Sequence, residues 1–323
     1  MTNKPTLEGI RDAALLLEPP FSKTPLFRSE HLSRQLDADV WLKIESINPI
    51  ASFKSRGATV AISRAIASRG ISEIVTSSTG NHGQGVALAS RLHGVASHVF
   101  MPSNPNPVKL AMIESLGAIV HKTGDDLDYA KAEALAFAAE RGSFFVDDGE
   151  DGDVMEGAGT VGLEIAEALD AIDRVVFPMG SGNLAAGSAT ALKAIHPTVQ
   201  VTAVQSTGSP AMAESFAQRK AVELPATSVA DGLECRVPAA LALERVIALV
   251  DDVITVSDDD ILRACRTMLE LQHLVTEPAG AAALAGAASV AKEFQARRVV
   301  LVVSGANLTT ALFQRAVGGH GLF

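Results

Sequence analysis

The sequence predicts an α/β protein with two domains, each an open, mostly parallel, twisted sheet covered by helices. Short runs of β-branched residues alternate along the chain with alanine-rich stretches of helical spacing. Repeated β–α alternation favours parallel strands joined by covering helices. The strand candidates are nearly continuously apolar, as expected of sheets that are buried on both faces. With 323 residues, the chain has the length of about two domains.

The predicted elements follow one another in a regular order. A strand-like segment at residues 41–45 ends in a turn at Asn48-Pro49, and further strands are expected at residues 74–76, 98–101, 119–121, 144–146, 175–177, 201–204, 253–256 and 299–303. The spacing of apolar residues predicts helices over residues 60–68, 86–92, 130–140, 161–169, 184–195 and 261–271. No repeat, low-complexity tract or long block of like charge interrupts this pattern.

Composition argues against several classes of protein. The chain has 37 acidic and 27 basic residues and a net charge of −10, so a general binder of nucleic-acid backbones is not expected. No apolar run reaches the ~18 residues of a membrane span, and residues 1–5 lack the apolar core of a signal peptide. Cys235 and Cys265 lack metal-ligand spacing and fit reduced thiols. We therefore expect a cytoplasmic protein with no membrane or nucleic-acid partner.

One lysine stands where a reactive amine can form. Lys54 follows Phe53 in the run 52–58 (Ser-Phe-Lys-Ser-Arg-Gly-Ala), just after the first predicted strand and its turn. Desolvation at such a loop-to-helix junction disfavours the ammonium form. A neutral amine can form a Schiff base with a carbonyl compound. Taken alone, the segment is more simply interpreted as a solvated lysine at the end of a loop.

A glycine-rich loop predicts a phosphate site. The run 180–184 (Gly-Ser-Gly-Asn-Leu) follows a strand and opens an alanine-rich helix. Glycines let the backbone approach a ligand, and a helix start offers free N–H groups and the positive end of the dipole. With Ala185 the loop also matches the looser G-x-G-x-x-A dinucleotide pattern, but the next strand ends in Gln205 instead of an acidic residue. A nucleotide-dependent oxidoreductase is thus an alternative, although it leaves Lys54 unexplained.

Two more polar segments follow predicted strands. The run 77–82 (Ser-Ser-Thr-Gly-Asn-His) opens the next helix, where backbone N–H groups would bind an anion by the same physics. Ser304 follows the apolar run 299–303. The alternative interpretations are a helix cap and a surface imidazole for Asn81 and His82, and a helix N-cap for Ser304.

Together these segments resemble, in the same order, the motifs of the fold-type II pyridoxal-phosphate enzymes, the tryptophan synthase β-like superfamily. The similarity is greatest to the threonine/serine dehydratase and serine racemase branch, and Lys23-Thr24-Pro25-Leu26 is similar to its N-terminal motif. The resemblance implies pyridoxal phosphate as cofactor and an amino acid as substrate. It implies Lys54 and Thr79 as catalytic residues, cofactor contacts from Phe53, Lys54, Asn81, Gly180, Ser181, Gly182, Asn183, Leu184 and Ser304, and substrate contacts from Ser77, Ser78, Thr79, Gly80, Asn81 and His82.

The resemblance also implies an arrangement of domains and a reaction. A small domain at residues 53–150 would be inserted into a large domain of residues 1–52 and 151–323, with the cofactor in the cleft between them. Lys54 would hold the cofactor as a Schiff base and, once freed, take the α proton. The neutral hydroxyl of Ser304 against the pyridine nitrogen would favour loss of a β substituent over long-lived carbanion chemistry. A homodimer is expected.

The expected reaction converts a serine- or threonine-like β-hydroxy amino acid to a 2-oxo acid and ammonia. An amino-acid racemase of the same branch is the nearest alternative. A β-replacement enzyme of the cysteine synthase kind comes third, because those relatives usually have threonine where His82 stands. A non-catalytic protein that binds the cofactor is the remaining alternative.

The sequence departs from the family pattern at several places. Thr79 stands where serine racemases carry a serine, and its extra methyl group predicts weak or absent racemisation. Gln205 and Ala211 occupy the places of two carboxylate metal ligands of the racemase-like branch, so no metal is expected there. Ser181 and Asn183 replace glycines of the phosphate loop, which puts the local geometry of that loop in question.

Charges near the expected cleft lead to further expectations. The absence of an arginine near residues 125–128 argues against acidic substrates. Residues 147–153 include five acidic residues, most simply interpreted as a solvated loop. The alternative is a preference for a substrate with a cationic side group. Because the chain ends shortly after Ser304, a C-terminal regulatory domain is not expected.

Overall fold

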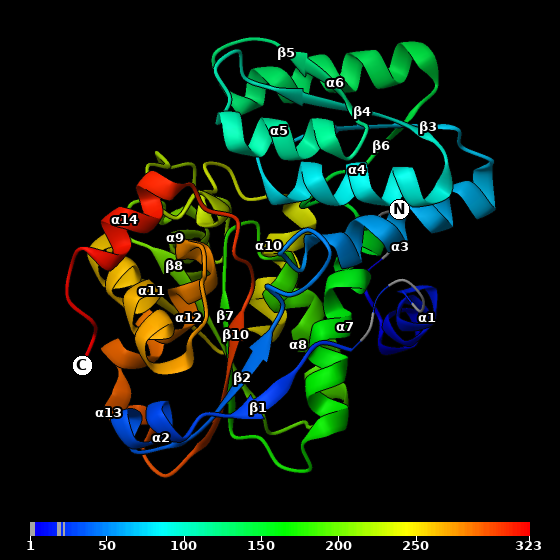
Figure 1. Cartoon of the computed structure of the whole chain (residues 1–323). Helices are drawn as coiled ribbons and strands as arrows, with labels where there is room; N and C mark the ends of the chain where they lie inside the picture. The colour runs from blue at the N-terminus through cyan, green and yellow to red at the C-terminus, as the bar shows by residue number, and fades with distance from the viewer. Residues whose placement is uncertain (1–3, 18–20, 22) are drawn as a thin grey trace.

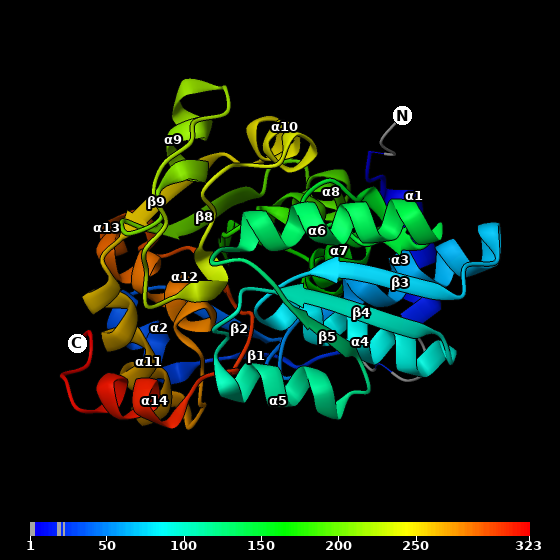
Figure 2. The ribbon, with the colours of Figure 1, turned by 90° about the horizontal axis from the view of Figure 1, so that it is seen from above.

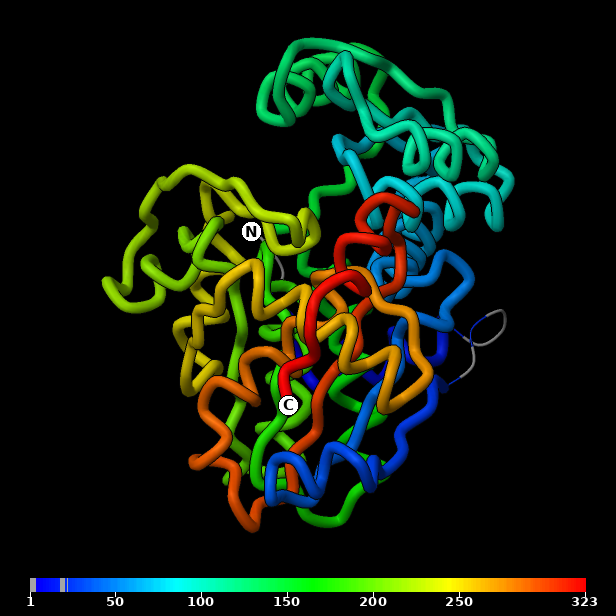
Figure 3. Tube along the Cα trace, turned by 60° about the vertical axis from the view of Figure 1, so that its left-hand side comes forward, coloured from blue at the N-terminus to red at the C-terminus, as the bar shows by residue number. Residues whose placement is uncertain are grey.

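A six-stranded sheet joins segments from both ends of the chain. The computed structural model describes residues 4–17, 21 and 23–323. The strand order is β1-β2-β10-β7-β8-β9, and only β1 and β2 are antiparallel neighbours. β2 and β10 pair along their whole length, so the blue and the orange-red parts of the chain run together in Figure 3. The strands are β1 (Leu26–Arg28), β2 (Asp39–Ile44), β7 (Arg174–Pro178), β8 (Gln200–Ser206), β9 (Asp252–Val256) and β10 (Arg298–Val303).

A second sheet comes from the middle of the chain. Its four strands have the order β5-β4-β3-β6 and are all parallel. This sheet lies above the larger one in Figure 1, where it is coloured cyan to green. Its strands are β3 (Glu73–Ser77), β4 (Ala96–Met101), β5 (Ile119–Lys122) and β6 (Phe144–Phe145).

Helices cover both faces of each sheet, as parallel strands require. Figure 2 shows α6 on one side of the smaller sheet and α4 and α5 on the other. In the larger sheet, α8 and α12 lie on opposite faces. The helices are α1 (Leu7–Leu17), α2 (Glu30–Leu36), α3 (Lys54–Arg69), α4 (Asn81–His93), α5 (Pro107–Ser115), α6 (Leu127–Arg141), α7 (Gly152–Ala168), α8 (Asn183–Ile195), α9 (Ala211–Gln218), α10 (Ala240–Leu249), α11 (Asp258–Gln272), α12 (Pro278–Ser289), α13 (Ala291–Phe294) and α14 (Thr310–Val317), with a short 3-10 helix η1 (Asp231–Leu233).

The core of the larger sheet shows the alternation of a strand that is buried on both faces. Along β10, Val299, Leu301 and Val303 belong to one apolar cluster, whereas Val300 and Val302 belong to the cluster on the opposite face. Successive side chains of a strand point to opposite faces, so a run of consecutive apolar residues fills two cores at once. The functional loops at the ends of these strands therefore stand on a rigid base.

The predicted fold class, an α/β protein with mostly parallel sheets covered by helices, is confirmed. Every predicted strand overlaps an observed strand, and every predicted helix lies within or overlaps an observed helix. Burial on both faces does not hold for the edges, since the side chain of Ile119 on β5 is 52% exposed. Among the described residues, no helix combines the length and the apolar character needed to cross a membrane.

Candidate active site

A cavity of about 190 Å³ lies at the carboxyl ends of β3, β7 and β10, where ligand sites of parallel sheets are found. It is lined by loops from both sheets and by the first residues of α3, α4 and α8. Every residue expected to bind the cofactor or the substrate lines it: Phe53, Lys54, Ser77, Ser78, Thr79, Gly80, Asn81, His82, Gly180, Ser181, Gly182, Asn183, Leu184 and Ser304.

Lys54 is the first residue of α3, and its side chain is only 15% exposed. Its Nζ lies 5.1 Å from the centre of the Phe53 ring, as the sequence suggested. The solvated-lysine interpretation is therefore wrong. Sequence reasoning missed the partner: Nζ donates to Oδ1 of Asp148 over 2.6 Å. The amine thus stands in the cavity beside a carboxylate.

The stretch 147–153 is part of the structure around the cavity, and its interpretation as a solvated loop is wrong. None of its acidic side chains is exposed. Asp147 pairs with Lys131 over 2.6 Å, and its carboxylate also accepts from the backbone N–H of Gly149. Asp151 caps the start of α7. Burial, together with the nearby Asp153 carboxylate, raises the pKa of Asp151 to about 6.

The glycine loop between β7 and α8 forms a cradle for an anion. Gly182 has φ 95°, a left-handed conformation that favours glycine. A Cβ atom on Gly180 would lie 2.6 Å from the carbonyl oxygen of Gly232, so the loop has no room for a side chain. The helix begins at Asn183 despite the departures from the family pattern, and its first N–H groups have no partner within the helix. Asn183 donates to the backbone oxygen of Asp148.

The second loop, residues 77–82, leads from β3 into α4, and its two polar side chains are held in place. Asn81 donates to Oε1 of Glu277 over 2.7 Å and accepts from Nδ2 of Asn307 over 2.8 Å. The imidazole of His82 is 5% exposed, which excludes the surface interpretation. Its Nε2 lies 3.3 Å from the carbonyl oxygen of Val146, an acceptor, so Nε2 carries the proton.

Burial lowers the pKa of His82, and the ammonium of Lys54 lowers it further, although Asp148 acts in the opposite direction. The ring is therefore neutral at neutral pH. Its Nδ1 is buried, has no hydrogen-bond donor and lies 3.4 Å from Oδ1 of Asp148.

Ser304 follows β10 and is buried at the floor of the cavity. Its carbonyl oxygen accepts from the N–H of Phe53 over 3.1 Å, which ties this strand end to the start of α3. The N-cap interpretation of Ser304 is wrong, because α14 begins at Thr310 with Thr309 as its cap.

Glu277 is a cavity residue that sequence reasoning missed. It is 2% exposed and stands at the start of α12. Burial raises its pKa to about 7, and the neighbouring charge of Lys109 only partly opposes this shift. A possible signal was the order Thr276-Glu277-Pro278 before an alanine-rich run, which marks a helix start.

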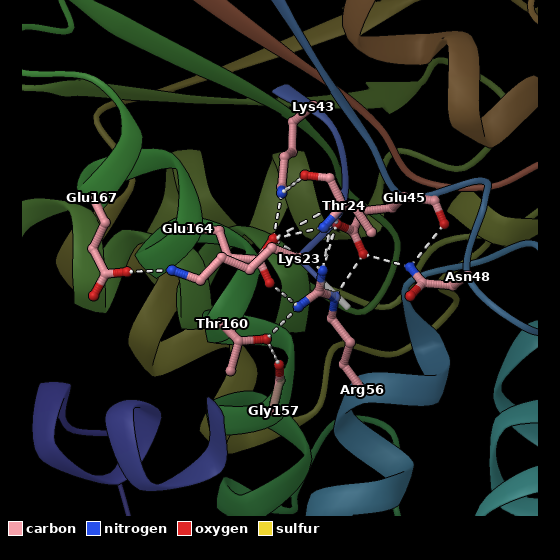
Figure 4. A network of polar contacts seen from close by, with 10 residues as sticks. All are labelled: Lys23, Thr24, Lys43, Glu45, Asn48, Arg56, Gly157, Thr160, Glu164 and Glu167. Atoms are coloured by element: carbon pink, nitrogen blue, oxygen red, sulfur yellow. Dashed lines mark hydrogen bonds and ion pairs between the residues drawn. The ribbon is translucent and has the colours of Figure 1, made fainter. Parts of the chain in front are cut away.

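The start of α3 is anchored by a buried network of charges, drawn in Figure 4. Arg56, two residues after Lys54, is 2% exposed and donates to Glu45 over 2.7 Å and to Glu164 over 2.6 Å. Lys43 contacts Glu164 from β2. Burial alone would raise the pKa of Glu45, but the charges of Arg56 and Lys43 outweigh it and hold the pKa below its usual value. The network joins β2, α3 and α7 and fixes the direction in which α3 leaves the cavity.

The sequence has no arginine near residues 125–128, but the fold brings one there: Nε of Arg236 donates to Asp128 over 2.8 Å from a distant part of the chain. The argument against acidic substrates therefore loses its basis. Gln205 directs its Oε1 at the backbone N–H of Ala213, 2.8 Å away. The absence of a metal at this place remains a prediction.

Comparison with known proteins agrees with this geometry. Residues 17–305 match the profile of a family described as "Pyridoxal-phosphate dependent enzyme". The chain belongs to this family. Pyridoxal phosphate is therefore its cofactor. The chain is 34% identical to an L-threonine ammonia-lyase of Geobacter sulfurreducens over 93% of this chain and 75% of the relative. It is also 34% identical to a catabolic L-threonine dehydratase of Staphylococcus aureus over 98% of this chain and 93% of that one.

Two solved structures are similar to the protein over nearly the whole chain. Maize serine racemase has a TM-score of 0.91 at 28% identity and covers 98% of both chains. Threonine deaminase isoform 2 of Solanum lycopersicum has a TM-score of 0.89 at 29% identity, over 98% of this chain and 96% of that chain.

The residues of the cavity fit pyridoxal phosphate. The loop 180–184 offers helix N–H groups and a glycine cradle that suit a phosphate. Lys54 offers an amine for the aldehyde, and the hydroxyl of Ser304 suits the pyridine nitrogen. The buried Oδ1 of Asn183 has no donor within the protein, which fits a site shaped for a bound group.

Proposed function

We propose that the chain is a pyridoxal-phosphate-dependent ammonia-lyase. It removes water and ammonia from a β-hydroxy amino acid of the serine or threonine type and releases a 2-oxo acid. The observation that carries this proposal is that Lys54, the glycine loop and the 77–82 loop line one cavity. The two relatives named for threonine ammonia-lyase and threonine dehydratase support the choice of substrate.

Each loop has a separate task in this reaction. When bound, pyridoxal phosphate draws electrons from the α carbon of the substrate, so that its proton can leave. Residues 180–184 and Ser304 hold the cofactor. The N–H groups at the start of α4 bind the substrate carboxylate. Asn81 is kept in one orientation by Glu277 and Asn307, so its amide can face the cofactor.

Proton movement centres on Lys54. Its Nζ accepts the α proton, and the electron pair of the Cα–H bond becomes the second bond between Cα and Cβ. The Cβ–O bond breaks with its electron pair on oxygen, which takes the proton that Nζ received and leaves as water. Hydrolysis of the unsaturated product gives the 2-oxo acid and ammonia. Asp148, 2.6 Å away, stabilises Nζ after the transfer, when it is positively charged.

The first test is attachment of the cofactor. The purified chain is supplied with pyridoxal phosphate, reduced with borohydride and digested, and the modified residue is found by mass spectrometry. We expect the label on Lys54 and its loss in Lys54→Ala. Serine and threonine of both configurations are then assayed for ammonia. A label elsewhere, or no ammonia from any β-hydroxy amino acid, contradicts the proposal.

Racemisation is the second candidate activity, favoured by the similarity to maize serine racemase. Thr79 lines the cavity beside Ser78. The resemblance to serine racemases implies that its hydroxyl acts on the face of the substrate opposite Lys54. Its methyl group crowds that face, so we propose that racemisation is weak. Comparing isomer formation with ammonia release in one reaction tests this; racemisation as fast as elimination would show that the proposal is wrong.

We also propose that residues 53–150 form the small domain and that residues 1–52 and 151–323 form the large one. All four strands of the smaller sheet lie within the first range, which supports this division. We propose a cytoplasmic homodimer. Both cysteines are unpaired, as in a reducing compartment. Sedimentation analysis would test the dimer.

A further inference from the structure

A second cavity, of about 400 Å³, adjoins the active site. Ser77, Leu127, Asp148, Ser181 and Glu234 line both cavities, so the two spaces meet at Asp148. A side chain of a bound amino acid can therefore extend from the active site into this second space.

The second cavity is lined by more negative than positive side chains. Its two cations already have partners, since Lys131 pairs with Asp147 over 2.6 Å and Arg236 with Asp128 over 2.8 Å. Among the described residues, the ammonium of Lys54 is the one lysine or arginine paired with Asp148. The remaining contact of the Asp148 carboxylate with a donor is the hydroxyl of Ser181, at 3.4 Å.

His82 adds a second acceptor at the same place. Its Nε2–H points to the Val146 carbonyl oxygen, so its Nδ1 presents a lone pair. This buried Nδ1 has no donor and lies 3.4 Å from Oδ1 of Asp148. Two acceptors this close repel each other unless a donor lies between them. At the junction of the two cavities, the protein thus presents a carboxylate and a neutral imidazole nitrogen to the same space.

We propose that the preferred substrate carries a protonated amine on its β carbon, received by Asp148 and His82. The inference rests on the proposed elimination reaction and specifies its substrate class. Before the substrate binds, the amine of Lys54 is engaged by the cofactor, so Asp148 and His82 lack its ammonium as a donor when the substrate arrives. An ammonium supplies three N–H groups and a positive charge, whereas a hydroxyl supplies one donor and no charge.

The reaction of such a substrate balances without a further acid. Nζ of Lys54 takes the α proton, and the Cα–H electron pair forms the double bond to Cβ. The Cβ–N bond breaks with its pair on nitrogen, so the ammonium departs as neutral ammonia. Water then converts the unsaturated product to the 2-oxo acid and releases a second ammonia. The carboxylate of Asp148 keeps the β amine protonated until the bond breaks.

The test compares kcat/KM for 2,3-diaminopropionate and for serine, in both configurations, with the cofactor-loaded enzyme. We expect the wild type to prefer the diamino acid by about tenfold or more, as a charged hydrogen bond allows. Asp148→Asn should remove most of this preference, and Asp148→Glu should keep part of it. Asp153→Asn is the matched control: its carboxylate comes from the same stretch but pairs with Arg64 outside both cavities, so the preference should be unchanged.

A binding measurement separates recognition from chemistry. The γ-amine of 2,4-diaminobutyrate is not a β leaving group, and 2-aminobutyrate is the same molecule without that amine. Changes in cofactor absorption give the dissociation constant of each. We expect tighter binding of the diamino compound in the wild type and equal binding in Asp148→Asn.

Turnover of serine with no preference for the diamino acid in the wild type would overturn the inference while leaving the proposed function standing. If the preference for the diamino acid survives Asp148→Asn, Asp148 does not recognise the β-ammonium group. Absence of ammonia from both substrates, together with no label on Lys54, would instead remove the proposed function.

Discussion

The side-chain amide of Asn81 donates to Oε1 of Glu277 over 2.7 Å, which joins the start of α4 to the start of α12 across the active-site cavity. The other carboxylate oxygen of Glu277 is buried without a donor. Burial of this oxygen without a donor favours the protonated acid and raises the pKa of Glu277 to about 7.

Glu277 should make the cofactor-free protein less stable as pH rises. The pKa of Glu277 in the folded state is about 7, against 4.5 for the unfolded chain. The folded state therefore binds the extra proton, and its stability falls between these two values by ~3 kcal/mol. Glu277→Gln imitates the protonated acid and should remove this part of the pH dependence. Urea unfolding of both forms at several pH values measures the difference; parallel curves would contradict the prediction.

His82 should make the protein less stable as pH falls, the opposite of the effect of Glu277. Its pKa is lowered in the folded state, mainly by burial, so protonation favours the unfolded chain. The contribution of His82 is fully present above the usual histidine pKa of ~6.5 and is lost as pH falls through the folded-state value. We expect His82→Gln to lose less stability than the wild type on acidification. Histidine NMR would report the same shift directly, and a normal titration of this ring would disprove it.

Gly182→Ala should weaken binding of pyridoxal phosphate. The backbone at φ 95° becomes strained, and the new Cβ would lie 2.9 Å from Cγ2 of Val246. Gly70→Ala is the matched control, because Gly70 also has positive φ, at 65°, but has no atom within 4 Å of a new Cβ. Both variants should lose ~1–2 kcal/mol of stability from backbone strain. Only Gly182→Ala should raise the dissociation constant of the cofactor. A titration that measures the absorption of the bound cofactor gives this constant.

Arg56→Met should strongly destabilise the protein. It leaves Glu45 and Glu164 without their main cation, and a broken buried pair costs ~3–5 kcal/mol. Arg263→Met is the comparison, since the Arg263–Asp260 pair is exposed and such pairs contribute ~0–1 kcal/mol. Urea unfolding of the cofactor-free proteins gives both values. Similar losses of unfolding free energy in the two variants would show that the buried network contributes no more to stability than an exposed ion pair.

The sequence was informative where a local motif follows a buried strand. The loop 180–184 and Ser304 follow the neighbouring strands β7 and β10, so parallel pairing was enough to place these two together. The loop 77–82 follows β3 of the other sheet, so its place in the same cavity was expected only from the family resemblance. The apolar strands themselves were recognisable because consecutive β-branched residues suit burial on both faces.

What sequence reasoning missed depends on distant contacts. Asp148 reaches Lys54 from the end of a stretch whose composition is typical of a solvated loop. Arg236 comes to Asp128 across 108 residues of chain. The helix α12 has no polar face, because most of its residues are buried, so it shows no amphipathic period to recognise. Because α12 was not predicted, Glu277 at its start was missed as well.

The position of β10 between β2 and β7 sets an order for biosynthesis. The four strands of the smaller sheet have all been synthesised by residue 145, whereas the larger sheet lacks an inner strand until residue 303 is made. Domains fold as units during translation. We therefore expect the nascent chain to hold β2 and β7 without their common neighbour through most of synthesis, and the cofactor site, which includes Ser304, to be completed only after β10 is inserted.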